Sequence, residues 1–254
     1  MVSRTVVVLL AAATACSVAS AQAGGALVDR TKPGPSPTPQ VKPETRGDIF
    51  MAEKKYREAI DAYSEDPNKT AVTYNKIGIA YHQLQQLDNA RKYYDRALKM
   101  KRDYAEAMNN IGAVYYAKKS YRRAIRYYER ALKLQPSASV YSNLGTAYFA
   151  RKKFDDATKA YEEALRLDPD VFEHRSNVGT LLEDRTIEDR AKFHYYLAKM
   201  YAKSGRNELA LQYVRKALEE GFKERNKLNK DPEFEALRNT KEFQDLLTLE
   251  PRVL

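Results

Sequence analysis

Residues 74–81 read Y-N-K-I-G-I-A-Y and residues 90–98 read A-R-K-Y-Y-D-R-A-L, and versions of both segments return further along the chain. The glycines of this series lie 34, 33 and 34 residues apart, at Gly78, Gly112, Gly145 and Gly179. Small or large apolar residues recur 3, 12, 16 and 19 residues after each glycine. A fixed period of this length predicts a solenoid, because each unit cannot bury its own apolar face and must stack on the next.

Each repeat is predicted to consist of two amphipathic helices. Within 71–103 the apolar residues follow steps of three and four, which is the helical period. Glycine inside a helix costs roughly 1 kcal/mol relative to alanine, so its recurrence needs a packing reason. Without a Cβ atom, the second helix can approach the first closely. Pro136 and Pro169 close two of the units, and the predicted fold class is all-α.

The repeats resemble those of the tetratricopeptide repeat family. M-N-N-I-G-A-V-Y at 108–115 and Y-S-N-L-G-T-A-Y at 141–148 are similar to the first helix of the family. A-I-R-Y-Y-E-R-A-L at 124–132 and A-T-K-A-Y-E-E-A-L at 157–165 are similar to the second. The resemblance, strongest over 71–170, implies a tetratricopeptide-repeat solenoid, a right-handed superhelix of antiparallel helix pairs.

The phase of the repeats becomes ambiguous after residue 170. The frame through Gly179 makes 187–203 a second helix, whereas the same residues also fit a first helix followed by a partner at 206–220. We favour the latter pairing, with Gly205 at the turn. The solenoid is then expected at 45–222, with a short repeat at 45–68, full repeats at 71–104, 105–137 and 138–170, an irregular insert at 171–186, and a last repeat at 188–222. Residues 223–254 are expected to form a helical C-terminal cap, since solenoids need a polar end unit.

The front of the chain predicts export. Residues 1–21 combine a basic start, an apolar run and the small residues Ala19-Ser20-Ala21, which is typical of a cleaved signal peptide. Their apolar run is too short to span a bilayer, and no transmembrane helix is expected elsewhere. Cys16, the single cysteine, faintly resembles a lipoprotein attachment site, so anchoring through it is the alternative. Residues 22–44 are expected to be a proline-rich disordered linker.

The family resemblance implies that the first helices line a concave groove. Amide side chains gather two and three residues before the glycines, and aromatic rings follow four residues after them. Asparagine can hydrogen-bond the backbone of an extended peptide through both its donors and its acceptor; helix packing is the alternative explanation for both sets. The predicted peptide-binding groove comprises Asn75, Lys76, His82, Asn109, Asn110, Tyr116, Asn143, Phe149 and Asn177.

A second feature is the positive charge, which totals +10 for the chain. Many basic residues follow the turns between paired helices, so stacking would align them along one edge. Such an edge would attract an anionic envelope component, although solvated turn residues are the simpler explanation. The predicted basic edge comprises Lys118, Lys119, Arg122, Arg123, Arg151, Lys152 and Lys153. No nucleic-acid motif accompanies this charge, so nucleic acid is not expected as a partner.

The sequence offers no catalytic constellation. The three histidines are scattered, no metal-binding spacing is present, and neither a phosphate-binding loop nor a nucleophile elbow occurs. We therefore expect no enzyme, no metal and no cofactor. The leading prediction is an exported bacterial adaptor that binds a protein segment in its groove. The alternatives are a basic edge that binds an anionic polymer or membrane surface, and an assembly factor that self-associates into a homo-oligomer.

Overall fold

The computed structural model describes residues 41–173 and 186–250. Throughout these two ranges the chain is helical and contains no strand. The predicted signal peptide, Cys16, the linker up to residue 40, Asn177, Gly179 and most of the insert at 171–186 lie outside the described residues. Within the described ranges, no helix is both long enough and apolar enough to span a membrane.

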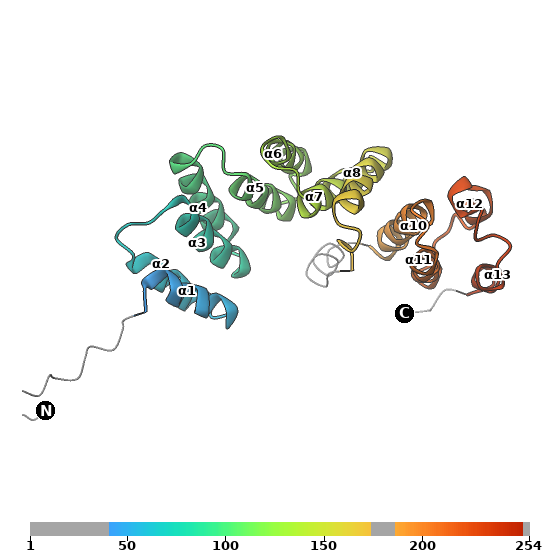
Figure 1. Ribbon diagram of the computed structural model, residues 1–254, viewed down its shortest axis with the longest axis horizontal. Coiled ribbons are helices and arrows are strands. Elements are labelled where there is room, and N and C mark those ends of the chain that lie inside the picture. Colours follow the sequence, from blue (N-terminus) through green and yellow to red (C-terminus); the bar gives the residue numbers. More distant parts are fainter. Residues whose placement is uncertain (1–40, 174–185, 251–254) are drawn as a thin grey trace, which may run out of the picture. The chain divides into compact units, whose positions relative to one another are not determined.

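Consecutive helices pack in pairs that are joined by short turns (Figure 1). The pairs are α1 (Pro43–Ala52) with α2 (Tyr56–Glu65), α3 (Ala71–Gln83) with α4 (Leu87–Met100), α5 (Ala105–Ala117) with α6 (Tyr121–Leu134), α7 (Ala138–Ala150) with α8 (Phe154–Leu167), and α10 (Ile187–Lys203) with α11 (Asn207–Glu219). From α2 to α7, the second helix of each pair also contacts the first helix of the next. The fold is therefore a tetratricopeptide-type solenoid. The structure pairs α10 with α11, so the C-terminal hairpin follows the later of the two phases.

One boundary differs from the sequence prediction. Helix α1 begins at Pro43, inside the segment that we expected to be disordered linker up to residue 44. Proline suits the first turn of a helix because the N–H it lacks would have no intrahelical partner there, and its fixed φ angle is already helical. The proline that we interpreted as part of a spacer therefore starts the first repeat.

The glycines receive the tyrosine ring that lies 16 residues later on the paired helix. A Cβ atom placed on Gly78, Gly112 or Gly145 would come within 2.5 Å of the ring of Tyr94, Tyr128 or Tyr161, respectively. The shortened first repeat has the same contact, between Gly47 and Tyr63. No real Cβ atom could occupy this space, which confirms that the glycines recur for close helix packing.

The last repeat replaces both members of this contact. Counting back from Ala210 and Ala217 places Ala198 in the glycine column and Val214 in the tyrosine column. Both residues are fully buried, at 0% exposure. A larger residue on the first helix thus accompanies a smaller residue on the second, which conserves the volume between them.

The turn inside each hairpin contains a residue with positive φ. Lys54, Gln85, Lys119 and Lys152 have φ values of 56–59°, and Gly205 has φ of 75°. All five stand seven residues after the glycine column, or after Ala198 in the last repeat. A residue with a Cβ atom is strained in this left-handed region, so four of the turns carry a local cost that Gly205 avoids.

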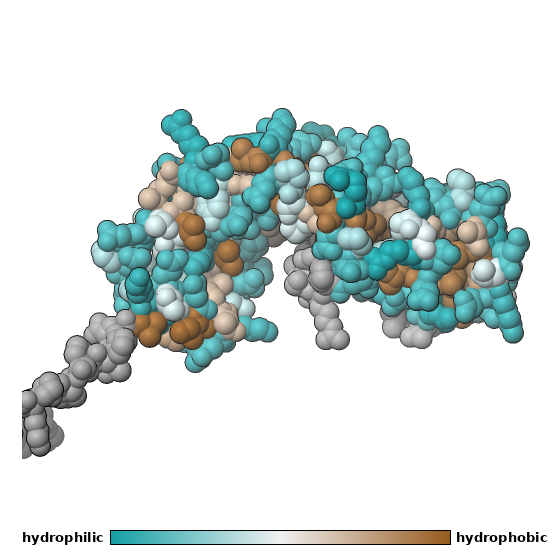
Figure 2. All heavy atoms as spheres, viewed as in Figure 1, coloured by the Kyte–Doolittle hydropathy of each residue, from teal (hydrophilic) through white to brown (hydrophobic). Residues whose placement is uncertain are grey.

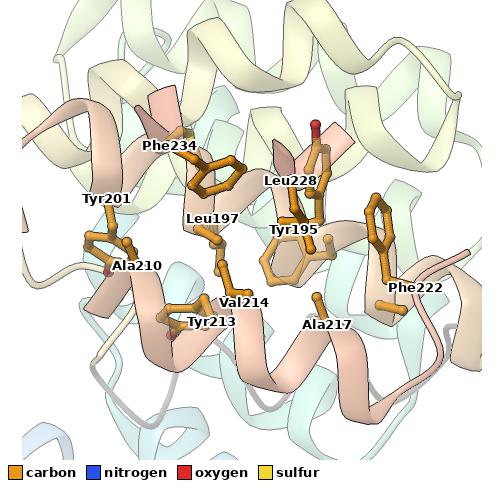
Figure 3. Packing of buried hydrophobic residues seen from close by; sticks show 14 of the residues in the cluster. Tyr195, Leu197, Tyr201, Ala210, Tyr213, Val214, Ala217, Phe222, Leu228 and Phe234 are labelled. Carbon is orange, nitrogen blue, oxygen red and sulfur yellow. The ribbon is translucent and has the colours of Figure 1, made fainter. Parts of the chain in front are cut away.

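The C-terminal segment covers the last hairpin with α12 (Asn226–Lys230), a 3₁₀ turn η1 (Pro232–Phe234) and α13 (Lys241–Leu247). Figure 3 shows how its apolar side chains meet those of α10 and α11. Phe222 stacks on Tyr195 with their ring centroids 4.4 Å apart, and Leu228, Phe234 and Phe243 are fully buried. The segment therefore shields the apolar end of the solenoid, as a helical cap should.

The glycine–tyrosine contact makes a prediction about stability. Gly112→Ala should lower the free energy of unfolding by roughly 2–4 kcal/mol, because the new methyl group overlaps the buried ring of Tyr128. Adding Tyr128→Val copies the pair of the last repeat. The double variant should therefore lose less than the sum of the two single variants, by about 1 kcal/mol or more in urea unfolding. Strict additivity would show that ring and methyl group do not compete for one space.

The left-handed turns predict a stabilising substitution. Lys119→Gly should raise the free energy of unfolding by about 0.5–1 kcal/mol, because glycine relieves the strain of positive φ. Gly205→Ala is the reciprocal control. Nothing lies within 4 Å of the added Cβ atom, so its expected loss of about 1 kcal/mol reports backbone strain alone. A destabilised Lys119→Gly variant would contradict this explanation.

Candidate functional site

A cleft of about 340 Å³ lies along the first helices of the middle repeats. Amide, hydroxyl and apolar groups from α3, α5, α7 and the segment before α7 form its lining, and Glu106 is its one charged lining residue. The lining consists of Asn75, Ile79, Ala105, Glu106, Asn109, Asn110, Gln135, Ser137, Ser139 and Val140. We call it the asparagine cleft. It brings together three of the predicted groove residues.

The asparagines hydrogen-bond one another between neighbouring repeats. Asn110 Nδ2 donates to Asn75 Oδ1 at 3.0 Å, and Asn143 Nδ2 donates to Asn109 Oδ1 at 3.1 Å. Within α5, Asn109 Nδ2 lies 3.4 Å from Asn110 Oδ1. In each rung, the residue two before the glycine donates to the residue three before the preceding glycine. Packing is therefore one role of these side chains.

Asn75 occupies the base of this ladder. It is only 3% exposed, so it is not an accessible contact for a partner, and its prediction as a surface groove residue was wrong. Nearby, the Tyr104 hydroxyl donates to Glu106 Oε2 at 2.9 Å. Burial and this carboxylate raise the pKa of Tyr104 to about 12, against a smaller opposing effect of Asn75. Tyr104 therefore stays protonated near neutral pH and holds Glu106 at the rim of the cleft.

An ionic rung replaces the amide rung at the first junction. Lys76 Nζ lies 2.9 Å from Glu44 Oε1 and 2.8 Å from Asp48 Oδ2, while the Tyr63 hydroxyl donates to Asp48 Oδ1 at 2.6 Å. Burial alone would raise the pKa of Asp48, but the hydrogen bonds from Lys76 and Tyr63 outweigh it and lower that pKa. The predicted groove residue Lys76 is thus engaged in joining the first two repeats.

The predicted aromatic stripe is explained by packing across the hairpin turns. Tyr116 lies 5.3 Å from Tyr121, and Phe149 lies 5.1 Å from Phe154, measured between ring centroids. Tyr121 and Phe154 each begin the second helix of their hairpin. Phe149 is also 4% exposed and contacts Phe193 of α10, so its prediction as a groove residue was wrong. His82 is half-buried, and burial lowers its pKa.

The predicted basic edge is partly engaged in contacts of its own. Lys118 pairs with Asp88, and Lys153 Nζ lies 3.0 Å from Asp156 Oδ2. Lys119, Arg122 and Lys152 are exposed at the turns. Hydrophilic residues dominate the face shown in Figure 2, and hydrophobic ones appear there as separate small groups. The edge remains a charged surface without a broad apolar component.

The sequence analysis missed several residues of the cleft lining. Glu106, Gln135, Ser137 and Ser139 come from the start of α5, the segment before α7 and the start of α7. They stand outside the columns next to the glycines, and only stacking of two repeats brings them together. No group of three metal-ligating side chains gathers anywhere in the described ranges.

Family comparisons agree with this architecture. Models of the tetratricopeptide repeat match residues 44–103, 105–137, 138–171 and 175–222. The fold and its cleft define a helical-repeat scaffold. The chain belongs to the tetratricopeptide repeat family, whose stacked repeats present extended surfaces for binding other proteins, and it is accordingly a protein–protein interaction scaffold.

Several solved structures share the fold. A MamA structure is 23% identical over 72% of this chain and 96% of its own, with a TM-score of 0.47. MamA from Desulfovibrio magneticus is 21% identical over 70% of this chain and 92% of its own, with a TM-score of 0.49. A chain of the APC/C hetero-tetramer Cut9-Hcn1 is 23% identical over 79% of this chain and 34% of its own, with a TM-score of 0.49. No curated protein matches the sequence. At these identities the likeness concerns the fold and not the partners.

The asparagine ladder makes a prediction about coupling. Asn110→Ala should cost roughly 1–2 kcal/mol of unfolding free energy, because it leaves the buried Asn75 Oδ1 without its donor. In a double-mutant cycle with Asn75→Ala, the two sites should couple by about 0.5–1.5 kcal/mol. Asn89→Ala, an exposed asparagine on α4, is the control and should change stability by less than about 0.5 kcal/mol. Additive effects at positions 75 and 110 would contradict the ladder.

Proposed function

We propose that this protein is an adaptor that holds an extended peptide segment of a partner protein in the asparagine cleft. The observation that supports this most directly is the make-up of the cleft. It gathers amide and hydroxyl groups from three successive repeats around a small apolar floor that includes Ile79 and Val140. Its volume of about 340 Å³ lies at the lower end of the range for ligand pockets, so it suits a short stretch of peptide.

The ladder leaves hydrogen-bonding capacity in the cleft. A side-chain amide has two N–H hydrogens and an oxygen with two lone pairs. Asn143 and Asn110 each use one hydrogen in the rungs described above, and both remain partly exposed. Ser137 and Ser139 hydroxyls, 3.0 Å apart, add donors and acceptors on the other wall. These groups can pair with peptide N–H and C=O groups whatever the peptide side chains are.

We place this adaptor in the bacterial cell envelope. The support is the sequence of residues 1–21, whose basic start, short apolar run and Ala19-Ser20-Ala21 are typical of a cleaved export signal. The mature chain would then begin near Gln22, in the periplasm or outside the cell. A lipid anchor at Cys16 is the alternative form of the same proposal.

A second candidate function uses the basic edge. Lys119, Arg122 and Lys152 expose their charges at successive hairpin turns, which favours attraction of an anionic polymer or membrane surface. Lys118 and Lys153 already face carboxylates, which weakens this candidate relative to the cleft. Binding at the edge would fall steeply as salt rises, because exposed charges are screened within about 10 Å at 0.1 M ionic strength.

A cleft-blocking substitution tests the leading proposal. Peptides of about 12 residues, selected by display on the full chain, should bind at least tenfold more weakly to Ser139→Trp, because the indole would fill the cleft. Val72→Trp is the matched control. Val72 occupies the same column on α3 and is 45% exposed, but it does not line the cleft, so affinity should stay within about twofold.

Fluorescence anisotropy gives both affinities, and circular dichroism checks that the variants fold. Selected peptides that bind wild type and Ser139→Trp equally would contradict the cleft. Equal losses in both tryptophan variants would show a nonspecific effect of the added ring and would contradict it as well.

A further inference from the structure

Positive charge is concentrated on two adjacent second helices. Helix α4 carries four basic and two acidic side chains, and α6 carries five basic and one acidic. The second helices on either side are acidic, since α2 has one basic and three acidic side chains and α8 has two basic and four acidic. The charge is thus local to the middle of the repeat series and is not a uniform property of the fold.

Tyrosine rings hold the guanidinium groups of these two helices. Tyr115 of α5 has the guanidinium carbon of Arg91 at 5.1 Å from its ring centroid and that of Arg123 at 5.6 Å. Arg91 belongs to α4 and Arg123 to α6, so the two basic helices converge on one ring. Cation–π contacts of this kind restrain a long side chain while leaving its charge in place.

The same arrangement repeats along both helices. Arg96 lies 4.8 Å over Tyr93, and Arg130 lies 5.1 Å over Tyr127. These pairs occupy the columns 15 and 18 residues after the glycine, where the flanking repeats have alanine and glutamate, at Ala62 with Glu65 and at Ala160 with Glu163. Helix α11 repeats the pair with Tyr213 and Lys216, but its acidic side chains equal its basic ones in number.

We define the arginine–tyrosine face as Arg91, Tyr93 and Arg96 of α4, Tyr115 of α5, and Arg123, Tyr127 and Arg130 of α6. An open cleft of about 780 Å³ runs along its α4 side, lined by Asp88, Arg91, Lys92, Asp95, Arg96, Leu98, Lys99 and Arg102. Within the described part of the chain, Arg91 Nε makes no hydrogen bond, and its nearest carboxylate, that of Asp95, lies 3.6 Å away. The guanidinium can therefore accept a carboxylate from outside.

We propose that the arginine–tyrosine face binds an acidic segment of a partner protein. Guanidinium groups pair with carboxylates in a bidentate manner, and groups already restrained on tyrosine rings lose less freedom on binding. The surface is separate from the asparagine cleft, so this inference goes beyond the peptide site proposed above and does not depend on it.

The two aspartates in the cleft favour a peptide over a phosphate polymer. Asp88 and Asp95 stand among the five basic lining residues. A nucleic-acid strand carries a charge about every 3.4 Å and would bring phosphates close to both aspartates. A peptide in extended conformation can place carboxylates at every second residue, about 6.8 Å apart, and keep small side chains opposite the aspartates. A flat bilayer surface would not enter a cleft.

The test uses the full chain and a fluorescein-labelled peptide of six Glu-Ala repeats. Fluorescence anisotropy should show binding at about 20 mM salt that weakens at about 150 mM, because the Debye length shortens. Lys92→Gln with Lys99→Gln removes two exposed charges of the α4 cleft and should weaken binding about fivefold or more.

Lys159→Gln with Arg166→Gln is the matched control, since it removes two charges from the same columns of α8. Its affinity should stay within about twofold of wild type. The same titration is run with inorganic polyphosphate and with vesicles of phosphatidylglycerol and phosphatidylcholine.

Three results would overturn the proposal. They are no binding of the acidic peptide at low salt, equal weakening by both variant pairs, and tighter binding of polyphosphate or vesicles that Lys92→Gln with Lys99→Gln abolishes. Ser139→Trp should leave the acidic peptide bound as in wild type, which separates this surface from the asparagine cleft.

Discussion

The contact between a glycine on one helix and a tyrosine ring on the next sets the geometry of every hairpin from α1 to α8. It fixes how closely the two helices approach, and the large buried rings then supply much of the core between repeats. The rest of the solenoid follows from that spacing, because each hairpin presents its remaining apolar residues to the next one. The last repeat supports this view by changing both partners together, to Ala198 and Val214.

A second constraint acts between repeats. Each junction in the first half of the chain contains a polar rung between first helices, made of Lys76 with Glu44 and Asp48, or of a pair of asparagines. Such rungs satisfy buried polar groups and fix the register of one hairpin on the next. The same side chains line the asparagine cleft, so the surface that we propose for peptide binding is also part of what holds the repeats together.

Much of the fold could be predicted from the sequence because its signal is periodic. The glycine column located the hairpins, and the columns 12 and 19 residues later located the alanines that are fully buried at 97, 131 and 164. The site was predicted less well. The asparagine column was found, but Asn75 and Phe149 proved to be buried, since a column of the repeat does not tell whether a side chain faces solvent or the neighbouring repeat. The charged face of α4 and α6 was also overlooked, because the basic residues were assigned to the turns and not compared helix by helix.

The sequence by itself determined the repeat, its period and the family, since these depend on apolar and small residues at local spacings that any stacked neighbour must satisfy. Only the tertiary structure decided which polar residues bind one another and which remain available. Asn75 with Asn110, or Arg91 with Tyr115 and Arg123, come from different helices. Their contacts depend on the distance and rotation between stacked hairpins, which no local spacing along the chain specifies.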